Sequence, residues 1–469
     1  MITTIAKFSA IASDIFMRCD VKYHQIESAC NYNIFGIPAN AQILLSDILR
    51  EDYLKFNYED GKEYKGIPTG QSYIDEDGDI IDYQPVTLDD HPDRLKYALT
   101  NDHILISSLR LAKSPALMFD TLDLNEYVFS NGFYSFAVSN DWNKKYVLYL
   151  LRTKALKSII DCNIYRGIGI SSYKVKDLLR IPVRNISKSE QEHTIKKIEP
   201  IEAKIASLKR SKCSIQETID FVFQREFGFD YDKFETLKSQ KYYFTQQSMF
   251  SNNPDLRFSV KYHRPAGDFV MEELIRISDK KIKHFISEPI VLGASISPSD
   301  FDESGEAYYV SMATIKTLEV VLDETQLVSS SYFEAKKAKS LQRNDIVVAR
   351  SGVAIGKTAI VRDDFDGIFA DFTMRIRFDE AKYNPLFAYY YLRSKYFQYL
   401  IEVYKKGLQN QNIFPIVMQE FPIPDISLPE QQRIVDEIQA EIENQEQIKA
   451  EIASLRNQID EVIIQSISA

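Results

Sequence analysis

Several short motifs occur twice in this chain of 469 residues, in the same order and about 240 residues apart. Near the start stands Arg18-Cys-Asp-Val-Lys-Tyr-His24, and Arg257-Phe-Ser-Val-Lys-Tyr-His263 matches it. Later, Ser187-Lys-Ser-Glu-Gln191 is matched by Ser427-Leu-Pro-Glu-Gln431. A single match arises easily by chance, whereas several in one order do not. The sequence therefore predicts two copies of one unit of about 230 residues.

Each copy is predicted to combine short strands with helices, which makes the fold class α+β. Short apolar runs at 103–109 and 345–349 indicate strands. Aromatic-rich stretches at 146–160 and 386–404 indicate helices, each followed by a glycine loop and one long helix. Both long helices begin with the Ser-x-x-Glu pattern of a capping box, in which the two side chains satisfy free backbone amides.

Apolar residues recur at heptad spacing in both long helices, as in the seam of a coiled coil. Because each copy supplies one seam, we expect the two helices to pair with each other. Glu441 and Gln445 weaken the second seam, and Pro200 is expected to kink or restart the first helix. The predicted seam residues are Ile198, Ile201, Ile205, Leu208, Ile215, Ile219, Val222, Ile434, Ile438, Ile448, Ile452, Leu455, Ile459 and Val462.

Two basic segments lie in a chain whose formal net charge is −10. Residues 141–184 carry 10 basic and 3 acidic residues, and residues 331–410 carry 14 and 9. Such segments can bind a polyanion through its phosphates, although either one alone is also compatible with an unevenly charged surface. No apolar stretch is long enough for a membrane span, and the four cysteines form no C-x-x-C pair, so we expect a cytoplasmic protein without a metal site.

No set of residues typical of an active site is found. Ser351-Gly-Val-Ala-Ile-Gly-Lys-Thr358 is close to a phosphate-binding P-loop, but a strand is expected after it, where a P-loop requires a helix. We interpret it as a hairpin that offers backbone amides and Lys357 to a DNA phosphate. Asn384-Pro-Leu-Phe387 lacks the second proline of a methyltransferase Asn-Pro-Pro-Tyr/Phe motif and is interpreted as a helix start. The chain is therefore expected not to be an enzyme.

The order of these parts resembles the specificity subunit of type I restriction-modification systems. Ile423-Pro-Asp-Ile-Ser-Leu-Pro-Glu-Gln-Gln-Arg-Ile-Val435 is similar to the family's proline-leucine-proline and Glu-Gln helix start. Residues 407–413 are similar to its glycine-glutamine loop, and residues 352–358 to its Gly-x-x-x-Gly-Lys hairpin. The first copy departs from the pattern, because residues 166–172 lack the Gln/Asn loop and residues 107–113 lack the hairpin glycines.

The resemblance implies what the chain does. Each unit would be a target recognition domain that reads one half of a split DNA sequence, and the two helices would form an antiparallel coiled-coil spacer. Modification subunits would carry the methyltransferase chemistry and S-adenosylmethionine, so this chain itself would bind no cofactor. The implied partners are double-stranded DNA, modification subunits and, where present, a restriction subunit, with no membrane.

Domain limits and site residues follow from the resemblance and from side-chain chemistry. The first recognition domain would span 1–186, the first spacer helix 187–226, the linker with the second recognition domain 227–426, and the second spacer helix 427–469. Basic side chains suit phosphates, and amides and guanidinium groups suit base edges. The candidate DNA-binding residues are Arg110, Lys113, Arg166 and Lys174 in the first unit, and Arg350, Lys357, Lys405, Lys406, Gln409, Asn410, Gln411 and Asn412 in the second.

Alternatives remain open at this point. Gln409 and Asn410 are equally compatible with ordinary turn residues. The whole chain is also compatible with a non-enzymatic coiled-coil interaction scaffold, or with the recognition half of a split methyltransferase-nuclease.

Overall fold

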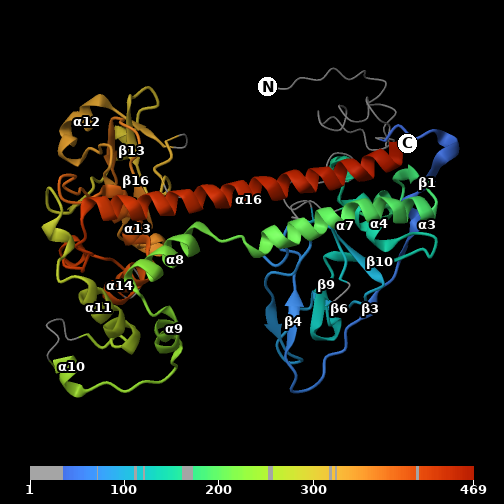
Figure 1. The fold of residues 1–469 in the computed structure, drawn as a ribbon, viewed down its shortest axis with the longest axis horizontal. Helices are drawn as coiled ribbons and strands as arrows, with labels where there is room; N and C mark the ends of the chain where they lie inside the picture. The colour runs from blue at the N-terminus through green and yellow to red at the C-terminus, as the bar shows by residue number, and fades with distance from the viewer. Residues whose placement is uncertain are drawn as a thin grey trace. The chain divides into compact units, whose positions relative to one another are not determined.

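The chain folds into two compact units, and each is described by itself. The computed structural model describes residues 35–70, 72–109, 114–119, 122–160, 173–251, 257–315, 319–322, 325–407 and 411–468. The first unit comprises Met1–Ser211 with Lys449–Ala469, and the second comprises Lys212–Ile448. Both mix helices with strands, in agreement with the α+β prediction (Figure 1). Across the described residues, every helix is too short or too polar to span a membrane.

The first unit contains two main sheets. One is a four-stranded antiparallel sheet in the order β2-β10-β7-β8, and the other is a five-stranded sheet in the order β3-β6-β9-β4-β5, in which β4 and β9 run parallel. Its strands are β1 (Gln42–Leu44), β2 (Leu49–Glu51), β3 (Leu54–Lys55), β4 (Tyr64–Ile67), β5 (Gln84–Val86), β6 (Leu95–Ala98), β7 (His103–Ser107), β8 (Ala116–Leu117), β9 (Tyr127–Ser130), β10 (Phe133–Val138) and β11 (Pro182–Arg184). Its helices are α3 (Leu45–Ile48), α4 (Lys144–Arg152), α5 (Lys154–Ile159), α6 (Val175–Leu178), α7 (Lys188–Arg210) and the C-terminal part of α16 (Leu428–Ser468).

The second unit also contains two main sheets. A four-stranded antiparallel sheet has the order β12-β18-β15-β16, and a three-stranded sheet has the order β14-β13-β17 with β13 and β17 parallel. Its strands are β12 (Val291–Leu292), β13 (Ala307–Val310), β14 (Leu327–Val328), β15 (Ile346–Ala349), β16 (Thr358–Ile360), β17 (Gly367–Phe369) and β18 (Thr373–Ile376). Its helices are α8 (Ile215–Phe227), α9 (Tyr231–Ser239), α10 (Gln247–Ser251), α11 (Pro265–Ile277), α12 (Ser330–Ala335), α13 (Pro385–Arg393), α14 (Lys395–Tyr404), α15 (Pro415–Met418) and the first part of α16.

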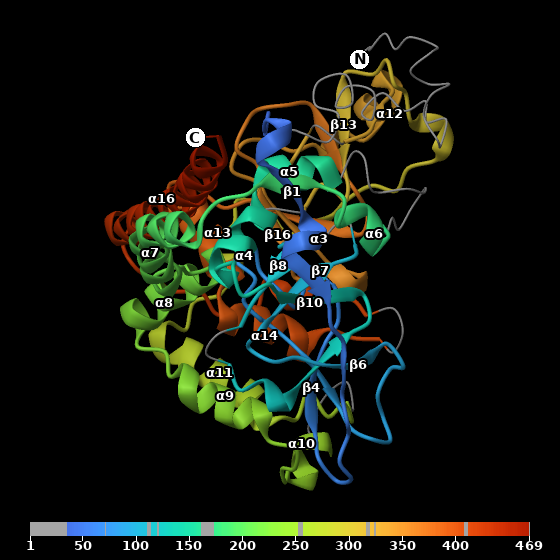
Figure 2. The same cartoon turned by 90° about the vertical axis from the view of Figure 1, so that its right-hand side faces the viewer.

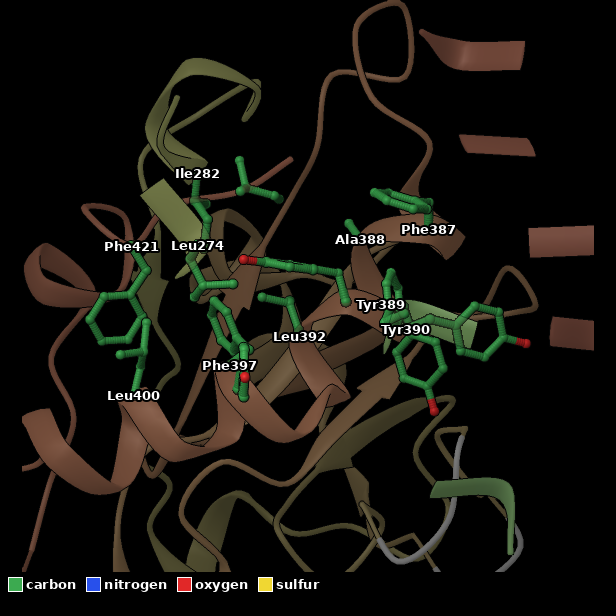
Figure 3. Packing of buried hydrophobic residues seen from close by; sticks show 14 of the residues in the cluster. Leu274, Ile282, Phe387, Ala388, Tyr389, Tyr390, Leu392, Phe397, Leu400 and Phe421 are labelled. Carbon is green, nitrogen blue, oxygen red and sulfur yellow. The ribbon is translucent and has the colours of Figure 1, made fainter. Parts of the chain in front are cut away.

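Aromatic side chains fill the core of the second unit around α13 and α14. Phe397 is fully buried and packs against Phe421, which follows α15, with ring centroids 5.6 Å apart. The fully buried Phe387 and Leu274 of α11 belong to the same cluster (Figure 3). Tyr391 is buried with them, and its hydroxyl donates to the carbonyl of Pro422 at 2.9 Å. Each such ring contributes about 1.5–3 kcal/mol through removal of apolar surface from water. The aromatic stretch predicted as helical therefore forms the core that supports the loops described below.

The predicted helix starts at Ser187 and Ser427 are confirmed. Ser187 Oγ accepts from the amide of Glu190, whose carboxylate accepts from the Ser187 amide at 2.9 Å. The same pair of bonds joins Ser427 and Glu430. Both helices therefore begin where the capping-box pattern placed them.

The prediction of one continuous helix over 187–226 is wrong. Helix α7 continues through Pro200 and ends at Arg210, and α8 begins at Ile215. A second capping box starts α8, since Ser214 Oγ accepts from the amide of Glu217 and the Glu217 carboxylate accepts from the Ser214 amide. This box favours a fresh helix start over continuation of α7.

A buried polar residue of α16 accepts a hydrogen bond from a backbone amide in the break between α7 and α8. Gln445 is almost fully buried, and its Oε1 accepts from the amide of Cys213 at 2.7 Å. Its Nε2 donates to Glu441 at 2.9 Å. The two polar residues that weaken the predicted second seam thus stand opposite the interruption in the first helix, within the second unit.

The seam residues are buried or half-buried in their own units. In the first unit, Ile198, Ile205, Ile452, Leu455 and Ile459 are buried. In the second, Ile219, Val222, Ile434 and Ile438 belong to one hydrophobic cluster. The half-buried members are Ile201, Leu208, Ile215, Ile448 and Val462.

Candidate nucleic-acid interface

A tight turn joins β15 to β16 in the second unit. The strands pair from Ile346 with Ile360 to Val348 with Thr358, and the Gly356 amide then donates to the Ala349 carbonyl at 2.9 Å. Gly352 and Gly356 have φ angles of 72° and 85°, in the left-handed region that glycine adopts most readily. The sequence 351–358 is therefore a hairpin followed by a strand, as predicted, and not a P-loop that opens a helix.

Arg350 joins three segments at the base of this hairpin. Its amide donates to the carbonyl of Phe372 at 3.0 Å, and its own carbonyl accepts from the amide of Ile413 at 3.0 Å. Its guanidinium donates to the carbonyl of Asp371 at 2.9 Å and to Asn412 Oδ1 at 3.3 Å. Because these bonds fix the half-buried side chain within the protein, Arg350 holds the loops together and has little freedom to turn toward a base.

The loop after α14 returns to the same place. Lys406 and Asn412 exchange two backbone hydrogen bonds of 2.8 and 2.7 Å, and Ser351 forms a β-bridge with Asn412. Gln411 and Asn412 are half-buried, and Gln409 and Asn410 lie outside the described residues. The structure therefore brings Asn412 and Lys406 beside the hairpin, whereas base contact by the amides stays a prediction.

The basic candidates of this region differ in their surroundings. The Lys357 side chain is exposed, and no ion pair of it is found among the described residues. Lys405 is only 12% exposed, and its ammonium pairs with Glu402 at 2.6 Å. An exposed, unpaired lysine suits a phosphate, whereas neutralisation and burial give Lys405 a role in the fold.

Exposed apolar side chains also lie on these segments, and the sequence analysis missed them. They are Val353 in the hairpin, Phe372 between β17 and β18, Phe414 before α15 and Ile416 within it. For Val353 the sequence contains one signal of an exposed position, because Val353 follows Gly352 in a turn that a second glycine closes.

Part of the positive charge of the basic segment 331–410 is neutralised by ion pairs inside the second unit. Asp345, whose side chain has no exposed surface, accepts two bonds of 2.7 Å from Arg377. Arg375 pairs with Glu288 at 2.5 Å, and burial holds its pKa below the usual value. Charge counted along the sequence therefore overstates the charge that this segment offers to a ligand.

Only one of the four candidate DNA-binding residues of the first unit lies among the described residues. Arg110, Lys113 and Arg166 lie outside the described residues. Lys174 is exposed just before α6. Elsewhere in segment 141–184, Lys144 pairs with Asp102 at 3.0 Å.

Arg152 also belongs to that segment. It donates to the carbonyl of Ala116 at 2.9 Å, and burial lowers the pKa of its guanidinium. Within the described ranges, no group of three or more His, Cys, Asp or Glu side chains is arranged to hold a metal ion.

One known protein family matches part of the chain. The family model of the type I restriction modification DNA specificity domain matches residues 289–454. That range contains the hairpin, Arg350 and the loop from Lys406 to Asn412. No curated protein sequence matches the chain.

Solved structures resemble the chain over most of its length. One is a chain from work on the structural basis of complex assembly and conformational transition of the type I R-M system. That chain is 12% identical to this one, with a TM-score of 0.52, and the likeness covers 91% of this chain and 97% of that chain. The HsdS subunit from Thermoanaerobacter tengcongensis is 13% identical, with a TM-score of 0.37, over 91% and 96%. The type I restriction-modification S subunit from M. genitalium is 11% identical, with a TM-score of 0.37, over 92% and 97%.

The first of these likenesses shows a shared fold, and the family model adds the identity of the domain that carries the hairpin. Residues 289–454 are therefore similar to the type I restriction modification DNA specificity domain.

Proposed function

We propose that the chain is the specificity subunit of a type I restriction-modification complex, and that each of its two units reads one half of a split DNA target. The observation that carries the proposal is the family match over residues 289–454, which spans the joined hairpin and loop around Arg350. The exposed Lys357 beside these loops supplies phosphate affinity. Asn412 and Gln411, on the loop beside the hairpin, would supply amides for base readout.

The internal likeness of the two units supports a bipartite target. Their four-stranded sheets have equivalent strand orders, and each unit has a parallel pair in its other sheet. In the first unit the buried Gln191 accepts from the amide of Asn143 at 2.6 Å, and in the second the buried Gln431 accepts from the amide of Asn384 at 2.8 Å. Two similar domains with different loops suit two different half-sites.

Contacts inside the first unit support an antiparallel spacer. Lys204, near the end of α7, pairs with Glu451 in the middle of α16. Tyr146 bonds to Ser466 near the end of α16, and Tyr146 lies one turn from Asn143, which bonds to Gln191 at the start of α7. The two helices therefore run in opposite directions, and they lie beside each other in both views (Figure 1, Figure 2).

Contacts inside the second unit agree with this direction. Arg433 of α16 pairs with Glu226 at the end of α8, whereas Gln445 bonds to Cys213 just before α8. Helix α8 and the first part of α16 therefore also run in opposite directions.

The chemistry of the complex would come from other chains. Modification subunits would bind S-adenosylmethionine and methylate adenine, and a restriction subunit would cleave unmodified DNA. This chain would hold both half-sites in register, so that its partners act at a defined distance from each.

Labelled methyl transfer tests this function. The chain alone, mixed with tritiated S-adenosylmethionine and unmodified DNA, should transfer no label. The chain with its modification subunits should label one bipartite sequence. Label transfer by the chain alone, or labelling by the complex without sequence preference, would contradict the proposal.

A further inference from the structure

Four apolar side chains project from segments that are hydrogen-bonded to, or adjoin, Arg350. Val353 has a relative exposure of 108%, Ile416 of 70%, Phe372 of 55% and Phe414 of 41%. Phe372 accepts from the Arg350 amide, and Phe414 follows Ile413, which donates to the Arg350 carbonyl. The hairpin that carries Val353 begins at the next residue. These side chains therefore belong to one loop cluster.

Val353 is the most exposed of the four, and its backbone is firmly held. It lies in the 3₁₀ turn Gly352–Ala354, and the amide of Ile355 donates back to the Gly352 carbonyl at 3.4 Å. The Lys357 amide donates to the Ala354 carbonyl at 2.9 Å, and Lys357 and Gly356 close the turn against Ala349. A valine in such a turn gains no burial within its own unit, yet little entropy would be lost when a ligand covers it.

The charge around the hairpin indicates which ligand covers it. Lys357 is exposed four residues after Val353, and Lys406 and the amide of Asn412 lie at the hairpin's other side. This combination of an ammonium, amide groups and a short apolar tip fits the major groove of duplex DNA. There, the only apolar group on a base edge is the 5-methyl of thymine.

We propose that Val353 reads a thymine in the second half-site through van der Waals contact with its 5-methyl group, while Lys357 contacts a neighbouring phosphate. This inference rests on the proposed function and deepens it by naming the base class that the hairpin selects. Arg350 is a positioning residue in this arrangement, because its bonds to Asp371, Phe372 and Asn412 hold the hairpin against the adjacent loops.

The experiment pairs a change in the protein with a change in the DNA. The target of the complete complex is mapped by methylation, and duplexes are made in which each thymine of the second half-site is replaced singly by deoxyuridine, which lacks the methyl group. Dissociation constants are measured for the wild-type complex and for Val353→Ala. At one thymine the wild type should lose roughly fourfold in affinity, equivalent to about 0.8 kcal/mol for one methyl-sized group.

Val353→Ala should bind the thymine duplex as weakly as the wild type binds the uridine duplex, with no further loss when both changes are combined. Ile275→Ala, which removes an exposed apolar side chain from α11, is the matched control and should keep the wild-type response.

Several outcomes would overturn the inference: equal sensitivity to deoxyuridine in Val353→Ala, insensitivity of the wild type at every thymine, or a second half-site without thymine on either strand. In these cases the wild-type complex still binds its target specifically, so the proposed function survives. Loss of all sequence preference in the wild type would instead reject the proposed function and the inference together.

Discussion

Lys357 and Lys405 carry the same charge in the same basic segment, but the fold gives them different surroundings. Lys357 is exposed beside the hairpin, whereas Lys405 lies against α14 and is neutralised by Glu402. Both were predicted to bind DNA from residue type and position alone. Neutralisation by a residue three positions earlier depends on side-chain direction, and a count of charges along the sequence does not include it.

Replacement of Lys357 tests its phosphate contact. Lys357→Ala should weaken binding by a similar factor on all DNA sequences and reduce the slope of log K against log salt by about 0.9. The measurement is fluorescence anisotropy over a salt series, with cognate and unrelated duplexes. Lys238→Ala, at an exposed lysine of α9, should leave the slope unchanged. A loss confined to the cognate duplex would mean that Lys357 reads a base.

Gln431 and Gln191 show how a motif found in the sequence acquires a physical role. The Glu-Gln pair recurs in both copies, but only the structure shows why glutamine follows the capping glutamate. Gln431 Nε2 donates to the Ile426 carbonyl at 2.8 Å, and its Oε1 accepts from the Asn384 amide, so one buried side chain joins α16 to the start of α13. Gln191 does the same for α7 and α4.

Removal of this glutamine amide should destabilise the unit that contains it. Gln431→Met keeps the size of the side chain but leaves the amide of Asn384 and the carbonyl of Ile426, both on half-buried residues, without their partner. We expect the free energy of unfolding of the second unit to fall by about 2–4 kcal/mol, measured by urea unfolding with hydrogen exchange to report on α13. Gln447→Ala, on an exposed face of α16, should change it by less than about 0.5 kcal/mol. Equal stability of both variants would contradict this role.

At the scale of elements, one loop of the first unit forms ion pairs with two helices. Lys209 of α7 reaches Asp75 and Asp79 at 2.5 Å each and Asp77 at 3.1 Å. Arg456 of α16 donates two bonds to Asp77, of 2.8 and 2.7 Å. The loop between β4 and β5 therefore fixes both helices to the sheet that carries it.

The pKa of Asp77 makes its ion pairs with Lys209 and Arg456 dependent on pH. Burial alone would raise that pKa, but the hydrogen bonds and charges of Arg456 and Lys209 outweigh burial and hold it below its usual value. A carboxyl group with a lowered pKa in the folded state stabilises the fold above its unfolded pKa of about 3.9, and this contribution disappears as the pH falls through the folded value. The ion pairs are therefore complete at neutral pH.

Asp77→Asn should lower the free energy of unfolding by about 2 kcal/mol at pH 7, because two charge-assisted bonds are weakened. The difference from the wild type should shrink as the pH falls below about 4, where the wild-type carboxylate is itself protonated. Urea unfolding at pH 7, 5 and 3 measures it, with the exposed Asp93→Asn as control. A difference that stays constant over this range would show that the charge of Asp77 does not contribute.

Local signals predicted the elements better than long-range patterns did. The capping boxes at Ser187 and Ser427 and the hairpin at 351–358 are confirmed, because each depends on neighbouring residues. The break at 211–214 has a local signal too, the capping box of Ser214 and Glu217. The heptad spacing alone does not reveal this break, because an apolar seam is compatible with two successive helices as well as with one.

At the scale of the whole molecule, the chain passes between the two units in only two places. One is the step from Ser211 to Lys212, in the break between α7 and α8, and the other is the step from Ile448 to Lys449, inside α16. The ion pairs of Lys209 and Arg456 with the loop between β4 and β5 lie wholly in the first unit. Those of Glu226 with Arg225 and Arg433 lie wholly in the second. Residues inserted at these two steps therefore leave these ion pairs intact.

Insertion of one heptad at both steps tests whether the helices set the distance between half-sites. In the continuous helix α16, seven residues add about 10 Å, and because seven residues nearly complete two turns, the added rotation is only about 20°. The seven residues inserted in the break between α7 and α8 supply the chain length that this extension needs. At about 3.4 Å per base pair, the unread gap should lengthen by roughly three base pairs while both half-sequences stay the same. Methylation mapping of the reconstituted complex reads the half-sequences and the gap together. Seven glycine and serine residues inserted in the exposed stretch between Lys241 and Gln246 should leave the gap unchanged, since this stretch lies within the second unit. An unchanged gap in the double insertion, or an altered half-sequence, would mean that the paired helices do not determine the spacing of the target.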